Sequence, residues 1–205
     1  MNTLIIVESP AKARKIQGFF TDGTKCIASV GHLYDLDPKS LSIDVEKDFH
    51  PSYQICPGKT KVIQRIRQMA KDHRVILGAD DDREGHAIAW HCARVAKLPL
   101  MERNRMTFHE ISKEAIHTSL QNLQRLDMDS VNAQQARRVI DRLVGFSLSP
   151  LLWKHIPTSH KGLSAGRVQT TLLALLNDHE QRLRDFRGVP KVSCRGAFTF
   201  PFGTG

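Results

Sequence analysis

The 205-residue sequence is long enough for one domain with a sizeable core and a second, smaller unit. Lysine and arginine outnumber aspartate and glutamate by 30 to 21, and the resulting net charge of +9 favours a polyanionic partner such as nucleic acid over a small neutral ligand. No apolar run approaches the ~18 residues of a membrane span. The four cysteines form no C-x-x-C pair, so neither a disulfide framework nor a zinc ribbon is indicated and a reducing, cytoplasmic setting is expected.

Short apolar runs and amphipathic segments alternate along the first part of the chain. The β-branched runs predict buried strands at residues 3–8, 25–31 and 74–79, with a last strand at the start of RMTFHEIS. Apolar positions at helical spacing predict helices within residues 9–20, 59–73 and 86–97. Strands that alternate with helices form a parallel or mostly parallel sheet, so residues 1–115 are predicted to fold as a compact, Rossmann-like α/β domain.

The remainder of the chain has a different pattern. From Lys113 to about Arg187 it is helical almost throughout, with interruptions at SLSP and PTSHKGLSAG, which predicts a mainly α-helical segment over residues 116–188. The tail KVSCRGAFTFPFGTG alternates apolar and polar residues and predicts a single orphan strand within residues 189–205. A strand without a partner suggests that the chain stops inside a larger protein.

Acidic residues gather in GADDDREGHAIAWH, at the end of a predicted strand. Ligands of open α/β sheets bind at the carboxyl ends of the strands, where Glu8 also lies, so we expect these acids to face one another. In an extended segment Asp80 and Asp82 point to the same side and Asp81 points away. Such oxygen ligands suit Mg²⁺. The alternatives are that the cluster only stabilises the N-terminus of the following helix, and that Glu8 is an ordinary strand-end residue.

Two motifs together, ESPAK after the first strand and D-x-D-x-E after a later one, resemble the Toprim domain, and the wider sequence resembles the type IA DNA topoisomerases. The likeness continues in family order through VGHLYDL, DFHPSY, DREGHAIAWH, RMTFHEIS, NAQQARRVIDRLVGFSLSPLLW and GLSAGRVQT, and covers almost the whole chain. DREG-x-AIAWH and SPLLW resemble the bacterial topoisomerase I branch. The chain departs from the family at His86, where an acid is common.

The resemblance implies the catalytic and metal positions. It places Glu8, Asp80, Asp82 and Glu84 at the positions that hold Mg²⁺, Glu8 also beside the scissile phosphate, and Lys12 where it would neutralise that phosphate. A phosphodiester transesterification needs a cation to offset charge on the phosphoryl oxygens and a proton donor for the leaving 3′ oxygen. Neighbouring carboxylates would raise the proton affinity of Glu8, which suits a general acid.

Basic residues are concentrated on one predicted helix, QQARRVIDRLVGF. Arg138 and Arg142 lie one turn apart, opposite an apolar stripe, and like charges at this spacing repel by roughly a few tenths of a kcal/mol unless an anion lies between them. The alternative is a solvated basic face on which Arg137 pairs with Asp141. The resemblance implies that this helix binds single-stranded DNA.

Further contacts with DNA are implied at other places. SAGRVQT opens a long helix whose exposed N–H groups, with Gly166 and Arg167, suit a phosphate, although a glycine there is also ordinary cap geometry. The resemblance adds His32, which would otherwise be taken as structural. The predicted DNA-binding residues are His32, Arg137, Arg138, Arg142, Ser147, Lys154, Ser164, Ala165, Gly166, Arg167, Val168 and Gln169.

The family cleaves DNA with a tyrosine in a motif close to Y-M-R-T-D, which this sequence does not contain. The only tyrosines, Tyr34 and Tyr53, lie in the Toprim half, so we expect the chain alone not to relax DNA. The implied function is the N-terminal part of a topoisomerase that relaxes negatively supercoiled DNA without ATP, nucleoid-associated in a bacterium, with the tyrosine supplied by a C-terminal portion. Two alternatives stay open: an inactive single-strand-binding module, and a Toprim nuclease whose metal activates water.

Overall fold

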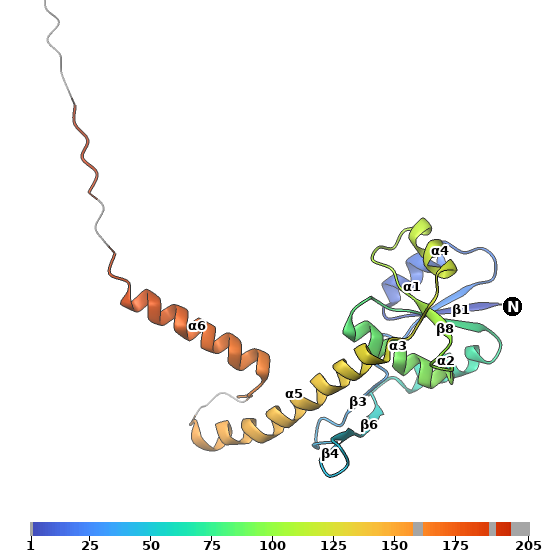
Figure 1. Cartoon of the computed structure of the whole chain (residues 1–205), viewed down its shortest axis with the longest axis horizontal. Helices are drawn as coiled ribbons and strands as arrows, with labels where there is room; N and C mark the ends of the chain where they lie inside the picture. Colours follow the sequence, from blue (N-terminus) through green and yellow to red (C-terminus); the bar gives the residue numbers. More distant parts are fainter. Residues whose placement is uncertain (1, 158–161, 189–191, 198–205) are drawn as a thin grey trace, which may run out of the picture. The chain divides into compact units, whose positions relative to one another are not determined.

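The structure, a computed structural model, describes residues 2–157, 162–188 and 192–197, and Figure 1 labels its helices and some of its strands. The chain divides into two units, Met1–Ser164 and Ala165–Gly205. The first unit contains, in order, β1 (Thr3–Val7), α1 (Pro10–Gln17), β2 (Lys25–Ala28), β3 (Tyr34–Leu36), β4 (Ile43–Asp44), β5 (His50–Pro51), β6 (Tyr53–Ile55), α2 (Thr60–Ala70), β7 (Arg74–Gly78), α3 (Arg83–Ala96), β8 (Arg103–Met106), α4 (Lys113–Gln121), β9 (Gln124–Arg125) and α5 (Met128–His155). The second unit contains α6 (Arg167–Asp185).

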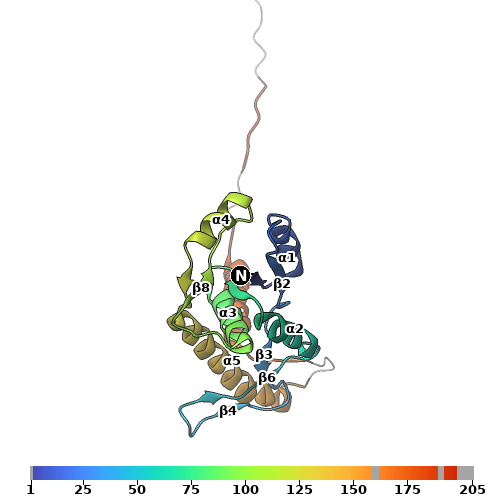
Figure 2. The same cartoon turned by 90° about the vertical axis from the view of Figure 1, so that its right-hand side faces the viewer.

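A five-stranded sheet in the order β2-β1-β7-β8-β9 forms the centre of the first unit. Its first four strands are parallel and β9 is antiparallel to β8. Helices cover both faces, α1 and α4 on one side and α2 and α3 on the other (Figure 2). Both faces of β1 are therefore buried: Leu4 and Ile6 pack towards α2 and α3, and Ile5 and Val7 towards α1 and α4. The predicted mostly parallel α/β fold is confirmed.

The second predicted strand is shorter than expected. It ends at Ala28 because Val30 and Gly31 adopt left-handed backbone conformations, with φ of 61° and 81°. Between it and α2 lie two small antiparallel sheets, β3 with β6 and β4 with β5, which the sequence did not indicate. Leu36 and Ile43 in these sheets pack against Val139 of α5.

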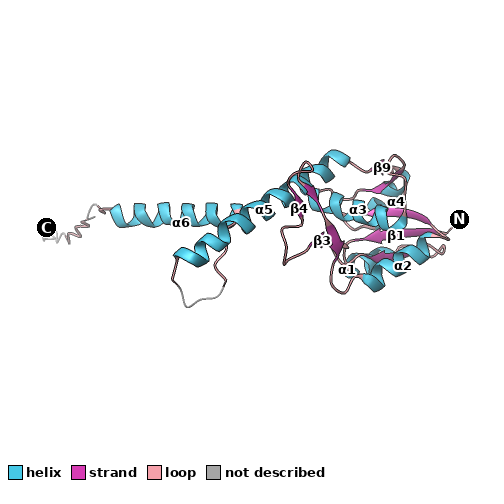
Figure 3. Cartoon of the chain, turned by 90° about the horizontal axis from the view of Figure 1, so that it is seen from below, coloured by secondary structure: helices cyan, strands magenta, loops and turns pink. Residues whose placement is uncertain are grey.

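The long helix α5 begins on the sheet domain and extends beyond it (Figure 3). Its first turns pack against α3, and Val131 is buried in the core that α3 shares. The predicted break at SLSP is wrong, because α5 runs through Pro150 without interruption. Proline removes one helical hydrogen bond, and Phe146, which would have accepted it, lies on an exposed part of the helix where water can replace the missing donor.

The other segments bear on the predicted domain boundaries. α4 and β9 pack on the sheet although residues 116–125 were placed in the helical segment. α5 ends before and α6 begins after the predicted interruption at PTSHKGLSAG, of which residues 158–161 lie outside the described part of the chain. Of the predicted orphan strand, residues 192–197 have no regular secondary structure, and residues 189–191 and 198–205 lie outside the described part of the chain. In the described ranges, no helix is long and apolar enough to cross a membrane.

Candidate functional site

The predicted acids come together at one edge of the sheet because β1 and β7 are parallel neighbours. Val7 is paired with Gly78, so the residues that follow them, Glu8 and the segment 79–82, leave the sheet side by side. We call residues 79–82 the acid loop. Two helices begin here: Ser9 caps α1 by accepting a hydrogen bond from the Lys12 amide, and Asp82 caps α3 by accepting one from Gly85.

Lys12 connects the two acidic segments. Its Nζ donates to Asp80 Oδ1 at 2.6 Å and also to Glu8 Oε1. Burial is the largest influence on the pKa of Lys12 and opposes its charge, but the carboxylates of Asp80 and Glu8 together raise that pKa. Burial likewise opposes the charge of Asp80, whereas hydrogen bonds with Lys12 and Glu8 lower its pKa overall. The direct partner of Glu8 is thus an ammonium group, which the like-charge argument from sequence did not include.

The other acids have separate partners. Asp82 Oδ1 accepts from the Gly85 amide at 2.6 Å, and Asp81 Oδ1 lies 3.4 Å from Nε2 of His86. Glu84, in the first turn of α3, accepts one hydrogen bond from Gln134 and pairs with His32. Each of the three aspartates therefore has its own partner, the opposite orientation of Asp81 stays a prediction, and the predicted four-acid set is not gathered around one point.

The fit of these residues to a metal ion rests on their chemistry. Among the described residues, no group of three or more His, Cys, Asp and Glu side chains is close enough to hold a metal ion. However, Asp80 and Asp82 line one cavity of about 370 Å³, together with Lys12, Asp81, Phe108, His109, Glu110 and Ile111. Mg²⁺ typically takes one or two carboxylates, with water and substrate phosphates as further ligands. The oxygen donors of Asp80 and Asp82 fit that requirement.

Arg105, which the sequence analysis did not single out, lies beneath the acid loop. It projects from β8 with an exposed fraction of 0%, and its guanidinium donates to the carbonyl oxygens of Ala79 and Asp80, each at 2.6 Å. Gly85 closes the loop from the other side, since a Cβ there would lie 2.2 Å from the Asp80 carbonyl oxygen. A charged residue inside a predicted strand was the available signal, but only the adjacency of β8 to β7 shows what it binds.

The basic residues of α5 reach the segment around β3. Arg138 forms a two-pronged pair with Asp35, in which Nε donates to Oδ1 at 3.1 Å and Nη2 donates to Oδ2. Arg142 donates to three backbone carbonyl oxygens, and its guanidinium lies 5.0 Å from the ring centre of Phe146. Arg137 lies 3.9 Å from Asp141, the alternative pairing considered from sequence. Each arginine therefore has its own partner in the chain.

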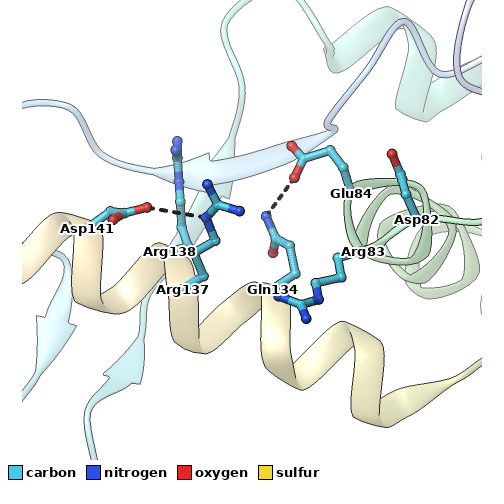
Figure 4. Close-up of a pocket in the computed structure, with 7 residues that line it drawn as sticks. All are labelled: Asp82, Arg83, Glu84, Gln134, Arg137, Arg138 and Asp141. Carbon is cyan, nitrogen blue, oxygen red and sulfur yellow. Dashed lines mark hydrogen bonds and ion pairs between the residues drawn. The ribbon is translucent and has the colours of Figure 1, made fainter. Parts of the chain in front are cut away.

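The acid loop and α5 meet at a second cavity of about 490 Å³ (Figure 4). It is lined by Asp82, Arg83 and Glu84 at the start of α3, and by Gln134, Arg137, Arg138 and Asp141 on α5. Figure 4 shows Gln134 and Glu84 pointing toward each other, joined by a hydrogen bond of 3.2 Å. Residues predicted for metal binding and for DNA binding therefore share one cavity.

His32 is connected to this cavity through Glu84 and to a cluster of aromatic rings around His91. The centre of the His91 ring lies 5.1–5.7 Å from the ring centres of His32, Tyr34, Tyr53 and Trp90. Burial lowers the pKa of His91 to about 3, with smaller contributions from the charges of His32 and Arg94. His91 is therefore neutral at physiological pH and supports His32 by ring contact.

The remaining predicted DNA-binding residues lie in other places. Ser147 and Lys154 are exposed on α5, C-terminal to Arg142, and Ser164 ends the first unit. The other five open the second unit, where Gly166 is the N-cap of α6 and its carbonyl oxygen accepts from Thr170 at 2.8 Å; they are Ala165, Gly166, Arg167, Val168 and Gln169. The predicted helix start is thus present.

Comparison with known proteins agrees with this geometry. Residues 3–111 match the Toprim domain, so the fold and the acid loop define a Toprim-containing protein. Residues 125–199 match the DNA topoisomerase family. Full-length topoisomerase I from Thermotoga maritima is similar in structure, with a TM-score of 0.83 and 42% sequence identity over 90% of this chain. The chain belongs to the type IA DNA topoisomerases.

The match covers only 31% of the Thermotoga maritima protein, so the chain spans about a third of the length of that topoisomerase. The family and the fold class expected from the sequence motifs are confirmed. Toprim domains generally bind a divalent metal ion. The residues that hold it and those that contact DNA stay predictions.

Proposed function

We propose that the acid loop and α5 together bind Mg²⁺ and a single strand of DNA, as part of a topoisomerase that cleaves one strand, passes another through the break and rejoins the ends without ATP. The observation that carries this proposal is the shared cavity in which Gln134 of α5 is hydrogen-bonded to Glu84 (Figure 4). It places carboxylates suited to a hard cation beside arginines suited to a phosphate backbone. Phosphodiester chemistry requires both.

The residues around Lys12 have complementary roles in this proposal. Asp80 and Asp82 would hold Mg²⁺, which, when bound, offsets negative charge on the phosphoryl oxygens. Lys12, already paired with Glu8 and Asp80, is placed to donate to a phosphate oxygen instead. In this proposal Glu8 takes up a proton from solvent when Lys12 turns to the phosphate and gives it to the leaving 3′ oxygen during cleavage. The resulting carboxylate is stabilised by the Lys12 ammonium. In religation the 3′ hydroxyl returns that proton to Glu8.

The nucleophile is proposed to be a tyrosine outside this sequence. Tyr34 and Tyr53 both contact the His91 ring edge to face in the aromatic cluster, and neither is among the residues that line the two cavities. Burial is the main cause of the raised pKa of Tyr53, which disfavours the phenolate needed for attack. A carboxyl group and a cation cannot form a covalent bridge to DNA without a nucleophile.

The proposal is tested with negatively supercoiled plasmid and Mg²⁺. The purified chain should leave the plasmid topology unchanged, and denaturing gels should show no protein linked to DNA. Addition of the remainder of a related topoisomerase that carries the tyrosine should give relaxation, and Glu8→Ala should abolish it. Relaxation by the chain alone that survives Tyr34→Phe and Tyr53→Phe together would contradict the assignment. Strand hydrolysis without any covalent adduct would instead favour a metal-dependent nuclease.

A further inference from the structure

Two of the side chains predicted to contact DNA are already paired with carboxylates of the chain itself. Arg138 is paired with Asp35, and His32 with Glu84. The side chains of the Arg138–Asp35 pair remain 44% and 38% exposed, so a ligand in solution can reach both of them. We propose that Asp35 is a resident anion on the phosphate-binding face of Arg138, and that a DNA phosphate binds there by displacing it. This inference rests on the proposed binding of single-stranded DNA by α5.

The geometry of the pair is the geometry of phosphate recognition. Arg138 offers Nε and Nη2 side by side, and the two oxygens of Asp35 accept one bond from each. A phosphodiester presents two unesterified oxygens to the same fork, and arginine binds carboxylate and phosphate in this bidentate manner. The same pair of N–H groups can therefore bind either anion, and a phosphate takes the place of Asp35 when the guanidinium turns away from that carboxylate.

Asp35 is held in place by the backbone around it. It lies in the middle of β3, opposite Gln54 of β6, and its Oδ1 also accepts from the Leu36 amide at 2.7 Å. Leu36 is buried against α5. Burial opposes the charge of Asp35, but the hydrogen bond from Arg138 lowers the pKa of Asp35 overall. The carboxylate is therefore charged while it is paired with Arg138, and its bond from the Leu36 amide does not depend on Arg138.

The neighbouring cavity gives the incoming phosphate a route. Arg138 lines the cavity of about 490 Å³ with Gln134 and Arg137, and its side chain is partly exposed while it is paired with Asp35. Phosphate binds less tightly to an arginine that already has a carboxylate partner than to an unpaired arginine, because the new interaction has to offset the loss of the existing ion pair. Asp35 should thus weaken DNA binding and make release of the strand easier, while keeping Arg138 oriented between binding events.

The test compares asparagine variants of two aspartates, Asp35 and Asp37, that lie two residues apart in the sequence. Asp35→Asn removes the resident charge but keeps an oxygen acceptor for the Leu36 amide. Asp37→Asn makes the same change of net charge, yet the Asp37 carboxylate is bonded to the Lys39 amide and the Ser40 hydroxyl rather than to an arginine. Fluorescence anisotropy with a labelled single-stranded oligonucleotide gives the affinity of the full 205-residue chain for DNA, and thermal unfolding checks that each variant is folded.

Asp35→Asn should tighten binding by roughly two- to fivefold, the range expected for removal of a partly exposed competing ion pair, and by more than Asp37→Asn. In an Arg138→Ala background the difference between the two variants should vanish. Equal gains from both variants, or weaker binding by Asp35→Asn, would overturn the inference while leaving the proposed function intact. Failure of the unmodified chain to bind single-stranded DNA would instead overturn the proposed function, and this inference with it.

Discussion

The acid loop and the basic face of α5 line a common cavity, but they are held in place in different ways. The acid loop is fixed through its backbone, by the buried Arg105 and by close packing against Gly85. Arg138 is fixed through its side chain alone, by a partly exposed carboxylate 103 residues away in the sequence. Backbone fixation suits groups that must keep one position, whereas a side-chain pair at the surface can exchange partners.

The largest effect on stability is expected at the acid loop, which is fixed through its backbone. Arg105→Leu should lower the free energy of unfolding by roughly 3 kcal/mol, because the carbonyl groups of Ala79 and Asp80 lose their donors inside the protein. Arg103→Leu is the matched control, since it removes the same charge from an exposed position of the same strand and should change stability by less than about 0.5 kcal/mol. Urea denaturation followed by circular dichroism measures both.

Loss of the exchangeable Arg138–Asp35 pair should lower the free energy of unfolding by less. Arg138→Leu should cost at most about 1 kcal/mol, because the pair with Asp35 is partly exposed and screened by solvent. If Arg105→Leu and Arg138→Leu destabilise the chain equally, the distinction between a fixed loop and an exchangeable pair is wrong.

Substitutions of the aspartates in the acid loop should change stability less, but two of them should abolish metal binding. Asp80→Asn or Asp82→Asn should abolish Mg²⁺ binding. Asp81 lines the same cavity, but Asp81→Asn should retain binding because the Asp81 carboxylate lies against His86. Asparagine is chosen because it still caps a helix at position 82. Isothermal titration calorimetry measures the affinity for the metal. Equal losses in all three variants would contradict the separate orientation of Asp81.

The sequence was sufficient for the parts of the fold and site that depend on local pattern. Alternating apolar runs and amphipathic segments predicted the parallel sheet, and the rule that ligands lie at strand ends predicted that Glu8 and the acid loop are neighbours. The motif order identified the family. These features are encoded within short segments, so their spacing along the chain is informative.

What the sequence could not predict depends on contacts between distant segments. The sequence does not distinguish Arg105 from other charged residues, because its role depends on the pairing of β8 with β7. The partner of Arg138 lies in a three-residue strand, which is too short to give a periodic signal. Pro150 indicated a break that does not occur, because a single missing bond does not end a 28-residue helix. The two small sheets around β3–β6 were missed for the same reason of length.

The central claim is that α5, beside the acid loop, holds a single strand of DNA, and the salt dependence of binding tests it most directly. In the presence of EDTA the chain should bind a single-stranded oligonucleotide more tightly than duplex, and log K against log salt should have a slope near roughly −3 if about four phosphates are contacted. Arg138→Ala should flatten that slope by about 0.7, whereas Arg65→Ala, which removes an exposed arginine on α2, should leave it unchanged. Equal affinity for duplex and single strands, with the same slope for both variants, would contradict the account.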